Sequence, residues 1–248
     1  MTLGKSLPSY LARADGVRLA YRYQPGRGPT VVFLPGYISD MQGSKAQALS
    51  AWAAREGRAM LRLDYSGCGE SDSAFTDGTL DIWRDDALAI IRDVTAGPVV
   101  IVGSSMGGWL MLLVAEALGE QVLSLVGVAA APDFTEWGFS HAEKAEIAAN
   151  GKLERPSEYD DEPMLTTQGF WLSGQSNLRL NDEINLTFPV RLLHGQRDND
   201  VPFETSLRLA EKLRSSDVQT ILLKDGDHRL SRDADIAMLI DVVAKLAG

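Results

Sequence analysis

Cysteine and histidine are scarce in this sequence of 248 residues, which contains one cysteine and three histidines. A single cysteine cannot form an internal disulfide, so the fold does not depend on an oxidising compartment. An all-cysteine zinc site is excluded for the same reason, and the H-E-x-x-H pattern of zinc proteases is absent. We therefore expect no metal site.

Positive charge and targeting signals are also lacking. The 24 Lys and Arg residues are outnumbered by 34 Asp and Glu residues, and a net charge of −10 disfavours a nucleic-acid partner. The start, MTLGKSLPSYLARADG, has no apolar core of a secretory signal. Residues 94–115 are uncharged, but the run GSSMGG in their middle is unsuited to a helix in lipid. We therefore expect a cytoplasmic protein that does not bind a membrane.

The sequence does contain a regular alternation of short β-branched runs and helical stretches. Runs such as VVIVG and LVGVAAA are apolar on both faces, which is typical of a parallel sheet covered by helices on both sides. An Asp15-Gly16 pair between residues 10–14 and 17–23 predicts an N-terminal antiparallel hairpin. The other predicted strands are residues 30–34, 59–64, 99–102, 122–129, 190–194 and 218–223. The predicted helices are residues 44–55, 79–94, 107–118, 204–214 and 231–246. We expect one α/β domain over residues 1–248, with a doubly wound, mostly parallel sheet of about eight strands.

One segment, residues 133–188, is too long for a simple connection between two strands. It contains a predicted polar helix (141–149), an acidic stretch (154–162) and several large aromatic residues. One interpretation is a helical insertion whose aromatic side chains attach it to the body of the domain. The other, which we favour, is a helical lid over a site at the carboxyl ends of the strands, where open α/β sheets bind ligands.

The pattern G-x-S-x-G occurs at residues 103–107, directly after the strand PVVIV and before the helical run GGWLMLLVAEAL. A nucleophile on a sharp strand-to-helix turn needs small neighbours two positions away on both sides. Gly103 and Gly107 meet this need for Ser105, whereas Ser104 would have Val102 and Met106 at those positions. The pattern therefore predicts Ser105 as a catalytic nucleophile.

A serine hydroxyl needs a base to take its proton, and histidine is the usual base near neutral pH. In a strand–turn–helix arrangement of this kind, the chain order is serine, then acid, then histidine. His141 lies in the insertion and His194 at the end of a buried strand, before the best acid candidate. His228, in the loop KDGDHR before the last helix, is the predicted base.

The acid that orients His228 should follow the strand at residues 190–194. We predict Asp198, whose carboxylate would hold one tautomer of His228 and stabilise the imidazolium. Asp200 also fits by position, and the alternatives Asp225 and Asp133 remain open.

A developing oxyanion needs two preorganised backbone N–H donors. The amide of Met106, directly after Ser105, lies at a helix start, where the helix dipole also favours negative charge. The second predicted donor is the amide of Tyr37, in the loop after the strand TVVFL.

Together these residues resemble the α/β-hydrolase superfamily over nearly the whole chain. Five stretches carry the resemblance: FLPGY, DYSGCGESD, VGSSMGGWLML, LLHGQRDNDVP and DGDHRLS. The Pro35-Gly36 pair replaces the frequent His-Gly of that family. FLPGYISDM, GSSMGGWLML and DHRLSR are most similar to the subgroup that contains a mitochondrial acyl-protein thioesterase, which also cleaves acyl glucuronides. Members with an organellar address carry extra N-terminal sequence, whereas here the predicted fold starts almost at once.

The resemblance implies an α/β-hydrolase fold and a serine hydrolase that cleaves esters or thioesters of a small-molecule or acyl substrate. It gives Ser105, Asp198 and His228 the triad roles and needs no cofactor. Two other functions are a carbon–carbon hydrolase or acyltransferase with the same triad, and a ligand-binding protein on the same scaffold. An apolar acyl or aryl pocket is expected from five aromatic side chains: Trp109, Phe134, Trp137, Phe170 and Trp171.

Overall fold

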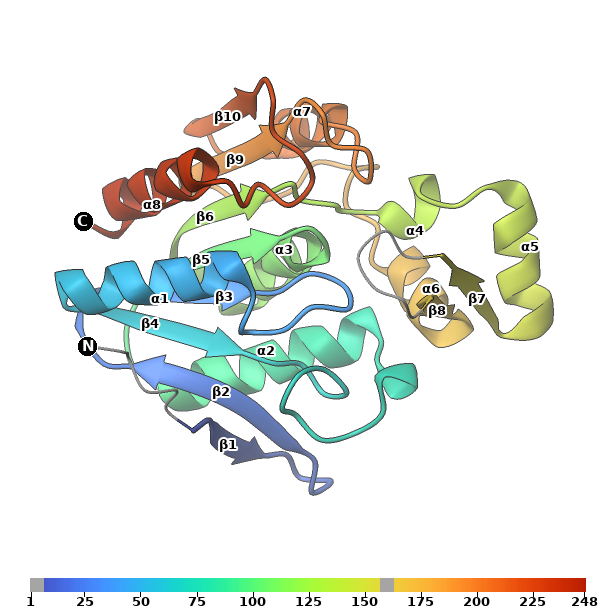
Figure 1. Ribbon diagram of the computed structural model, residues 1–248, viewed down its shortest axis with the longest axis horizontal. Helices are drawn as coiled ribbons and strands as arrows, with labels where there is room; N and C mark the ends of the chain where they lie inside the picture. Colours follow the sequence, from blue (N-terminus) through green and yellow to red (C-terminus); the bar gives the residue numbers. More distant parts are fainter. Residues whose placement is uncertain (1–6, 157–162) are drawn as a thin grey trace.

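Eight strands form one mixed sheet in the computed structural model, which describes residues 7–156 and 163–248 (Figure 1). In chain order they are β1 (Ser9–Ala12), β2 (Arg18–Gln24), β3 (Arg27–Leu34), β4 (Arg58–Leu63), β5 (Val99–Ser104), β6 (Val122–Val128), β9 (Val190–Gly195) and β10 (Val218–Leu223). Their order across the sheet is β1-β2-β4-β3-β5-β6-β9-β10. The pairs β1–β2 and β2–β4 are antiparallel, and the other pairs of this sheet are parallel. The predicted α/β fold with its N-terminal hairpin is confirmed.

The connection in this hairpin is longer than the two residues expected. The amide of Arg13 donates to the carbonyl oxygen of Val17 at 2.8 Å, and β2 begins only at Arg18. The Asp15 carboxylate accepts from the amide of Val17, and Gly16 has a φ of 88°. The side-chain hydrogen bond and the positive φ favour a wider turn at the Asp-Gly pair.

Helices cover both faces of the sheet. One face carries α1 (Ser44–Glu56) and α8 (Asp233–Ala247), and the other carries α2 (Leu80–Val94), α3 (Met106–Leu118) and α7 (Glu204–Lys212). Strand β3 shows why both faces are apolar, since successive side chains of a strand point to opposite sides. Val31 and Phe33 pack in the cluster under α1 and α8, whereas Val32 and Leu34 pack in the cluster with α2 and α3. Two short 3-10 helices, Phe75–Asp77 and Gly119–Gln121, lie in the connections.

The segment between β6 and β9 projects beyond the carboxyl ends of the strands, at the right of Figure 1. It contains α4 (Phe134–Trp137), α5 (His141–Asn150) and α6 (Gln168–Ser176). It also contains the antiparallel pair β7 (Lys152–Arg155) and β8 (Met164–Thr167), two strands that the expectation of a helical insertion did not include. Each of these strands has only four residues, too few for a clear alternating pattern. Residues 157–162, most of the acidic stretch, lie outside the described residues.

The uncharged run 94–115 is divided between β5 and α3. Across the described ranges 7–156 and 163–248, no helix is both long enough and apolar enough to cross a membrane.

The parallel strands bring separate parts of the sequence to one edge of the sheet. The loops after β3, β5, β9 and β10 carry Tyr37, Ser105, Asp198 and His228, in that order. Because carboxyl ends of parallel strands meet at the same edge, side chains far apart in the sequence can meet there.

Candidate active site

Ser105 lies in the sharp turn between the end of β5 and the start of α3, with φ 54° and ψ −121°. A positive φ is uncommon for residues other than glycine and marks a strained backbone. The turn depends on its glycine neighbours. A Cβ on Gly103 would lie 2.3 Å from the carbonyl oxygen of Gly107, and a Cβ on Gly107 would lie 2.2 Å from that of Leu34. These contacts are too short for any side chain, so the sequence requirement for glycine is steric.

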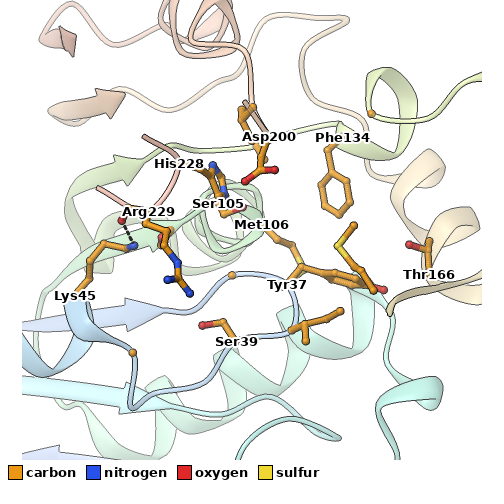
Figure 2. Close-up of a pocket in the computed structure, with 18 of the residues that line it drawn as sticks. Tyr37, Ser39, Lys45, Ser105, Met106, Phe134, Thr166, Asp200, His228 and Arg229 are labelled. Carbon is orange, nitrogen blue, oxygen red and sulfur yellow. Dashed lines mark hydrogen bonds between the residues drawn. The ribbon is translucent and has the colours of Figure 1, made fainter. Parts of the chain in front are cut away.

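The Ser105 hydroxyl lies within hydrogen-bond reach of His228, and His228 within reach of Asp198. Ser105 Oγ is 3.1 Å from His228 Nε2, and His228 Nδ1 is 2.9 Å from Asp198 Oδ2. Figure 2 shows the His228 ring beside Ser105 at the wall of a pocket. When the Nδ1 hydrogen is donated to Asp198, Nε2 is left free to accept the hydroxyl proton. The three predicted side chains are therefore brought together in an order that permits proton transfer.

The Asp198 side chain is fully buried and surrounded by hydrogen-bond donors. Its Oδ1 accepts from the amides of Asp200 and Val201, and its Oδ2 lies near both His228 and His194. Burial by itself would raise the pKa of Asp198. Hydrogen bonds from His194 and His228, the charge of His228 and the amide of Val201 outweigh it, so the pKa lies below its ordinary value. The carboxyl group is therefore an anion at the pH where histidine acts as a base.

His194 supports this acid, a role beyond the local strand-end function that its position suggested. The ring is fully buried, with Nε2 3.1 Å from Asp198 Oδ2 and 3.0 Å from the carbonyl oxygen of Val201. Both neighbours of Nε2 are acceptors, so we assign the hydrogen to this nitrogen. Nδ1 then accepts from the hydroxyl of Ser206 at 2.7 Å.

The other acids considered from the sequence have different partners. Asp225 is exposed and pairs with Arg197, and the Asp133 carboxylate accepts from the amides of Arg179 and Leu180 at 2.8 and 2.7 Å. Asp200 lines the same pocket as His228 with an exposed side chain. The carboxylate that hydrogen-bonds the His228 ring is that of Asp198.

The two predicted oxyanion donors border the pocket beside Ser105. Met106 is the first residue of α3, and Tyr37 follows Gly36 in the loop after β3. A Cβ on Gly36 would lie 3.3 Å from Ser105 Cβ and 3.9 Å from Ser105 Oγ, so this loop passes close to the nucleophile. The Tyr37 hydroxyl donates to the carbonyl oxygen of Leu165 at 2.6 Å, which connects the loop to strand β8 of the insertion.

The pocket has a volume of about 850 Å³, within the range of small-molecule sites. Two of the predicted aromatic residues, Phe134 and Trp137, line it. Phe139, another aromatic residue of the insertion, also lines it, as do Ile38 and Met164, which the sequence did not single out for this role. Nothing in the local sequence distinguishes Ile38 and Met164: Ile38 lies in the loop after β3, and Met164 reaches the pocket only when the insertion folds over the sheet.

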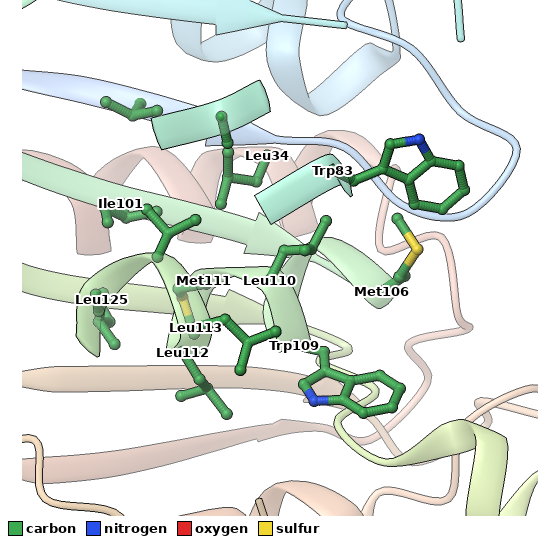
Figure 3. Packing of buried hydrophobic residues seen from close by; sticks show 14 of the residues in the cluster. Leu34, Trp83, Ile101, Met106, Trp109, Leu110, Met111, Leu112, Leu113 and Leu125 are labelled. Atoms are coloured by element: carbon green, nitrogen blue, oxygen red, sulfur yellow. The ribbon is translucent and has the colours of Figure 1, made fainter. Parts of the chain in front are cut away.

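The other three predicted aromatic residues are not among those that line this pocket: Trp109 and Phe170 are buried, and Trp171 is half-buried in the insertion. Trp109 lies fully buried on α3, where its indole N–H donates to the carbonyl oxygen of Asn177 (Figure 3). Phe170 is 1% exposed and packs behind Tyr37, with ring centroids 4.7 Å apart. Trp171 donates to the carbonyl oxygen of Thr135 and packs against the small core of the insertion. For Phe170 and Trp171 the structure supports the first interpretation, attachment of the insertion.

Asp198, Asp200 and His228 each offer one ligand atom within 4.8 Å of the others, which among the described residues is the arrangement that could hold a metal ion. An ion there would compete for the same carboxylate oxygens and ring nitrogens that form the hydrogen bonds described above.

Cys68 is buried, and burial raises the pKa of its thiol to about 12, so it is an unreactive turn residue.

Comparison with known proteins agrees with this geometry. The model of the alpha/beta hydrolase family matches residues 31–244. The chain is 40% identical to human palmitoyl-protein thioesterase ABHD10, mitochondrial, over 98% of this chain and 82% of the relative. Alpha/beta hydrolase domain-containing protein 10 from mouse superimposes with a TM-score of 0.91 at 40% identity, over 97% of this chain and 98% of that one. A putative hydrolase from Agrobacterium vitis S4 also gives 0.91, at 37% identity and the same coverage.

The names of the mammalian relatives correct one expectation. Proteins from human, orangutan, cattle, mouse and rat that share 39–41% of their residues with this chain are all named as mitochondrial. The expectation of a cytoplasmic location is therefore contradicted. It rested on the absence of a secretory signal at the start of the sequence, an absence that does not identify a compartment.

Proposed function

The chain belongs to the alpha/beta hydrolase family and is a serine hydrolase, and we propose that it cleaves carboxylic esters or thioesters through an acyl-enzyme on Ser105. The observation that carries the proposal is the chain of hydrogen bonds from Ser105 through His228 to Asp198, at 3.1 and 2.9 Å. Relatives named as thioesterases support the hydrolysis of thioesters in particular.

The first step is acylation. His228 Nε2 takes the proton of the Ser105 hydroxyl while Oγ forms a bond to the substrate carbonyl carbon. The carbonyl π-electron pair moves to oxygen and gives a tetrahedral intermediate. Its collapse breaks the bond to the leaving oxygen or sulfur, which receives the proton from His228. The Asp198 carboxylate remains ionised and stabilises the imidazolium that exists between the two transfers.

The oxyanion is stabilised by the backbone amides of Met106 and Tyr37. The start of α3 adds the favourable end of its helix dipole at the same point. In other enzymes, loss of one such donor reduces turnover by about 10²–10³. The short approach of the Gly36 backbone to Ser105 supports this role for the loop.

The second step is deacylation. Water takes the place of the leaving group, His228 removes one of its protons, and the oxygen attacks the acyl carbon. Collapse of the second intermediate breaks the bond to Ser105 Oγ, which regains its proton from His228. The products are a carboxylic acid and free enzyme, so the residues described here suffice for the reaction.

The insertion side of the pocket suits the acyl group. Phe134, Trp137, Phe139 and Met164 offer apolar surface there, and burial of each methylene contributes about 0.8 kcal/mol. The acyl chain would therefore lie between α4 and β8.

A fluorophosphonate probe tests the nucleophile directly. We expect covalent labelling of the wild-type protein and none of Ser105→Ala, with Ser104→Ala as the matched control that remains labelled. Mass spectrometry of the labelled peptide identifies the modified serine. A labelled Ser105→Ala protein, or a wild-type protein that does not react, would contradict the proposal. Hydrolysis of acyl thioesters and p-nitrophenyl esters of graded chain length then measures the preferred bond and acyl group.

A further inference from the structure

The loop that carries the Tyr37 amide is fixed to the body of the domain at both ends. At its start, the Tyr65 hydroxyl donates to the carbonyl oxygen of Pro35 at 3.2 Å. At its end, the Asp64 carboxylate accepts from the amide of Met41 at 2.7 Å. Asp64 and Tyr65 directly follow β4 and are both fully buried. The stretch DYSGCGESD, which takes no part in the proposed proton transfer, therefore holds the two ends of this loop.

The middle of the loop is strained directly after Tyr37. Ile38 has a φ of 51°, in the left-handed region where a β-branched residue is an outlier. A backbone conformation of this kind persists only when surrounding contacts determine it. The Ile38 side chain is 51% exposed, so its own packing contributes little to this restraint. The side chain of the adjacent Tyr37, by contrast, has contacts on several sides.

The Tyr37 ring packs against four aromatic rings, two from the body of the domain and two from the insertion. The centroids of the Phe75 and Trp83 rings lie 5.3 and 5.9 Å from that of Tyr37. Those of Phe134 and Phe170 lie 6.0 and 4.7 Å from it. Aromatic pairs at these separations attract one another beyond the effect of buried area. The ring is therefore held at the boundary between the sheet and the insertion.

The Tyr37 hydroxyl extends this attachment to strand β8. It donates to the carbonyl oxygen of Leu165 at 2.6 Å, and Figure 2 shows the ring pointing from the loop toward Thr166. Burial raises the pKa of this hydroxyl, against the opposing effect of a hydrogen bond with the Thr166 side chain. The hydroxyl therefore stays protonated, and so remains a donor, at the pH where His228 acts as a base.

We propose that the Tyr37 side chain is a positioning group for the oxyanion hole: through its bond to β8 it holds the backbone amide of the same residue in the direction that the oxyanion requires. The inference rests on the proposed hydrolase function and adds a second role for the insertion. The ring and the amide share one Cα, so a displacement of the ring also displaces the N–H group. The insertion thus supports the transition state as well as enclosing the acyl group.

Replacement of Tyr37 by phenylalanine tests this role, because it removes the hydroxyl and keeps the ring. The parameters kcat and KM are measured with p-nitrophenyl acetate and p-nitrophenyl octanoate. An acetyl group has one methyl group beyond the reacting carbon and therefore little contact with the insertion, whereas an octanoyl chain extends along its apolar residues. We expect kcat to fall about tenfold for both esters, less than the roughly 10²–10³ lost with a whole donor. KM for the acetate should remain at the wild-type value.

The division between kcat and KM separates positioning of the amide from an effect on the shape of the acyl pocket. If the hydroxyl only shaped that pocket, Tyr37→Phe would raise KM for the octanoate and leave kcat for the acetate at the wild-type value. This second result would overturn the inference.

The matched control is Ser173→Ala, which removes a different hydrogen bond between the insertion and the body. The Ser173 hydroxyl on α6 donates to the Asp81 carboxylate on α2 at 2.6 Å, and neither residue lines the pocket. We expect Ser173→Ala to lower Tm about as much as Tyr37→Phe and to keep the wild-type kcat. An equal loss of kcat in the control would show that any weakening of the insertion has this effect, and would refute a specific role of Tyr37.

Hydrogen–deuterium exchange measures the same restraint without turnover and so separates this inference from the proposed function. We expect the backbone amides of residues 35–41 to exchange faster in Tyr37→Phe than in the wild-type protein, and at the wild-type rate in Ser173→Ala. Unchanged exchange in Tyr37→Phe would overturn the inference even if the wild-type protein hydrolyses both esters. A wild-type protein that hydrolyses neither ester would count against the proposed function, whereas faster exchange of the loop would still support its attachment through Tyr37.

Discussion

Replacement of Asp198 by asparagine is the sharpest test of the proposed proton path, because it keeps the size of the side chain and exchanges one oxygen for an NH2 group. Oδ1 now accepts from the amides of Asp200 and Val201, at 2.9 and 2.8 Å. Oδ2 lies 2.9 Å from His228 Nδ1 and 3.1 Å from His194 Nε2. The amides of Asp200 and Val201 have fixed directions, so we expect the asparagine carbonyl oxygen to accept from them and the NH2 group to face His228.

The consequence for catalysis follows from the histidine tautomer. An NH2 group donates to His228 Nδ1, and the ring then carries its hydrogen on Nε2, directed at Ser105. Such a ring cannot take the serine proton, and the wrong tautomer costs serine proteases about 10⁴ in kcat. The opposite amide orientation would turn the NH2 group toward the amides of Asp200 and Val201 and deprive both of their hydrogen-bond acceptor, at about 0.5–1.5 kcal/mol each. We therefore expect kcat for Asp198→Asn to fall by about 10³–10⁴.

Hydrolysis of p-nitrophenyl butyrate with substrate in excess measures this kcat, and a thermal melt shows that the variant is folded. The matched control is Asp225→Asn, since Asp225 pairs with Arg197 and its side chain is 60% exposed. We expect the control to retain wild-type kcat within about twofold. If Asp198→Asn kept more than about a tenth of the wild-type kcat, the reasoning from the tautomer would be refuted. Asp200, Asp225 and Asp133 would then be the acids to examine.

Two further predictions concern the walls of the pocket. Gly36→Ala should lower kcat by about tenfold or more with little change in Tm, because the new Cβ would lie 3.3 Å from Ser105 Cβ and displace the loop that carries the Tyr37 amide. An unchanged kcat would argue against this loop as the source of an oxyanion donor. Trp137→Ala should reduce the preference for octanoyl over acetyl p-nitrophenyl esters by about fivefold or more, whereas Trp171→Ala, outside the pocket lining, should leave that preference unchanged.

The sequence was informative where function imposes a local steric or topological requirement. Ser105 needs glycine on both sides because a Cβ at Gly103 or Gly107 would collide with backbone oxygens at 2.3 and 2.2 Å. That requirement is visible as a pattern of five residues. The candidate base could be predicted because a parallel sheet brings successive strand ends together in a known order, and one of the three histidines follows the last strand. The positions of the central strands could be predicted as well, because strands that are buried on both faces appear in the sequence as continuous apolar runs.

The lining of the pocket could not be predicted, because it depends on contacts between distant segments. An aromatic residue in the insertion can contact either the substrate or the body of the domain, and the residue type does not distinguish the two roles. Phe134 and Phe170 illustrate this: their ring centroids are 5.7 Å apart, yet the first lines the pocket and the second is 1% exposed. Lys45 and Arg229 also line the pocket, and the Lys45 ammonium donates to the carbonyl oxygen of Arg229; no local pattern could have joined residues 184 positions apart. The expectation of a cytoplasmic location was contradicted by information of another kind, the names of the relatives.

His194, near the end of β9, and His228, in the loop after β10, differ in what they need from Asp198. In the proposed mechanism His228 gains and loses a proton in each step, so its hydrogen bond to the carboxylate would change strength during the reaction. His194 donates from Nε2 to Asp198 and Val201 while Ser206 holds Nδ1, so its ring has a fixed orientation and is fully buried. The amides of Asp200 and Val201 hold the other carboxylate oxygen. Asp198 is therefore held by three donors that take no part in proton transfer, and its position does not depend on the protonation state of His228. This independence lets one carboxylate orient the neutral ring before the attack of Ser105 and stabilise the imidazolium after it.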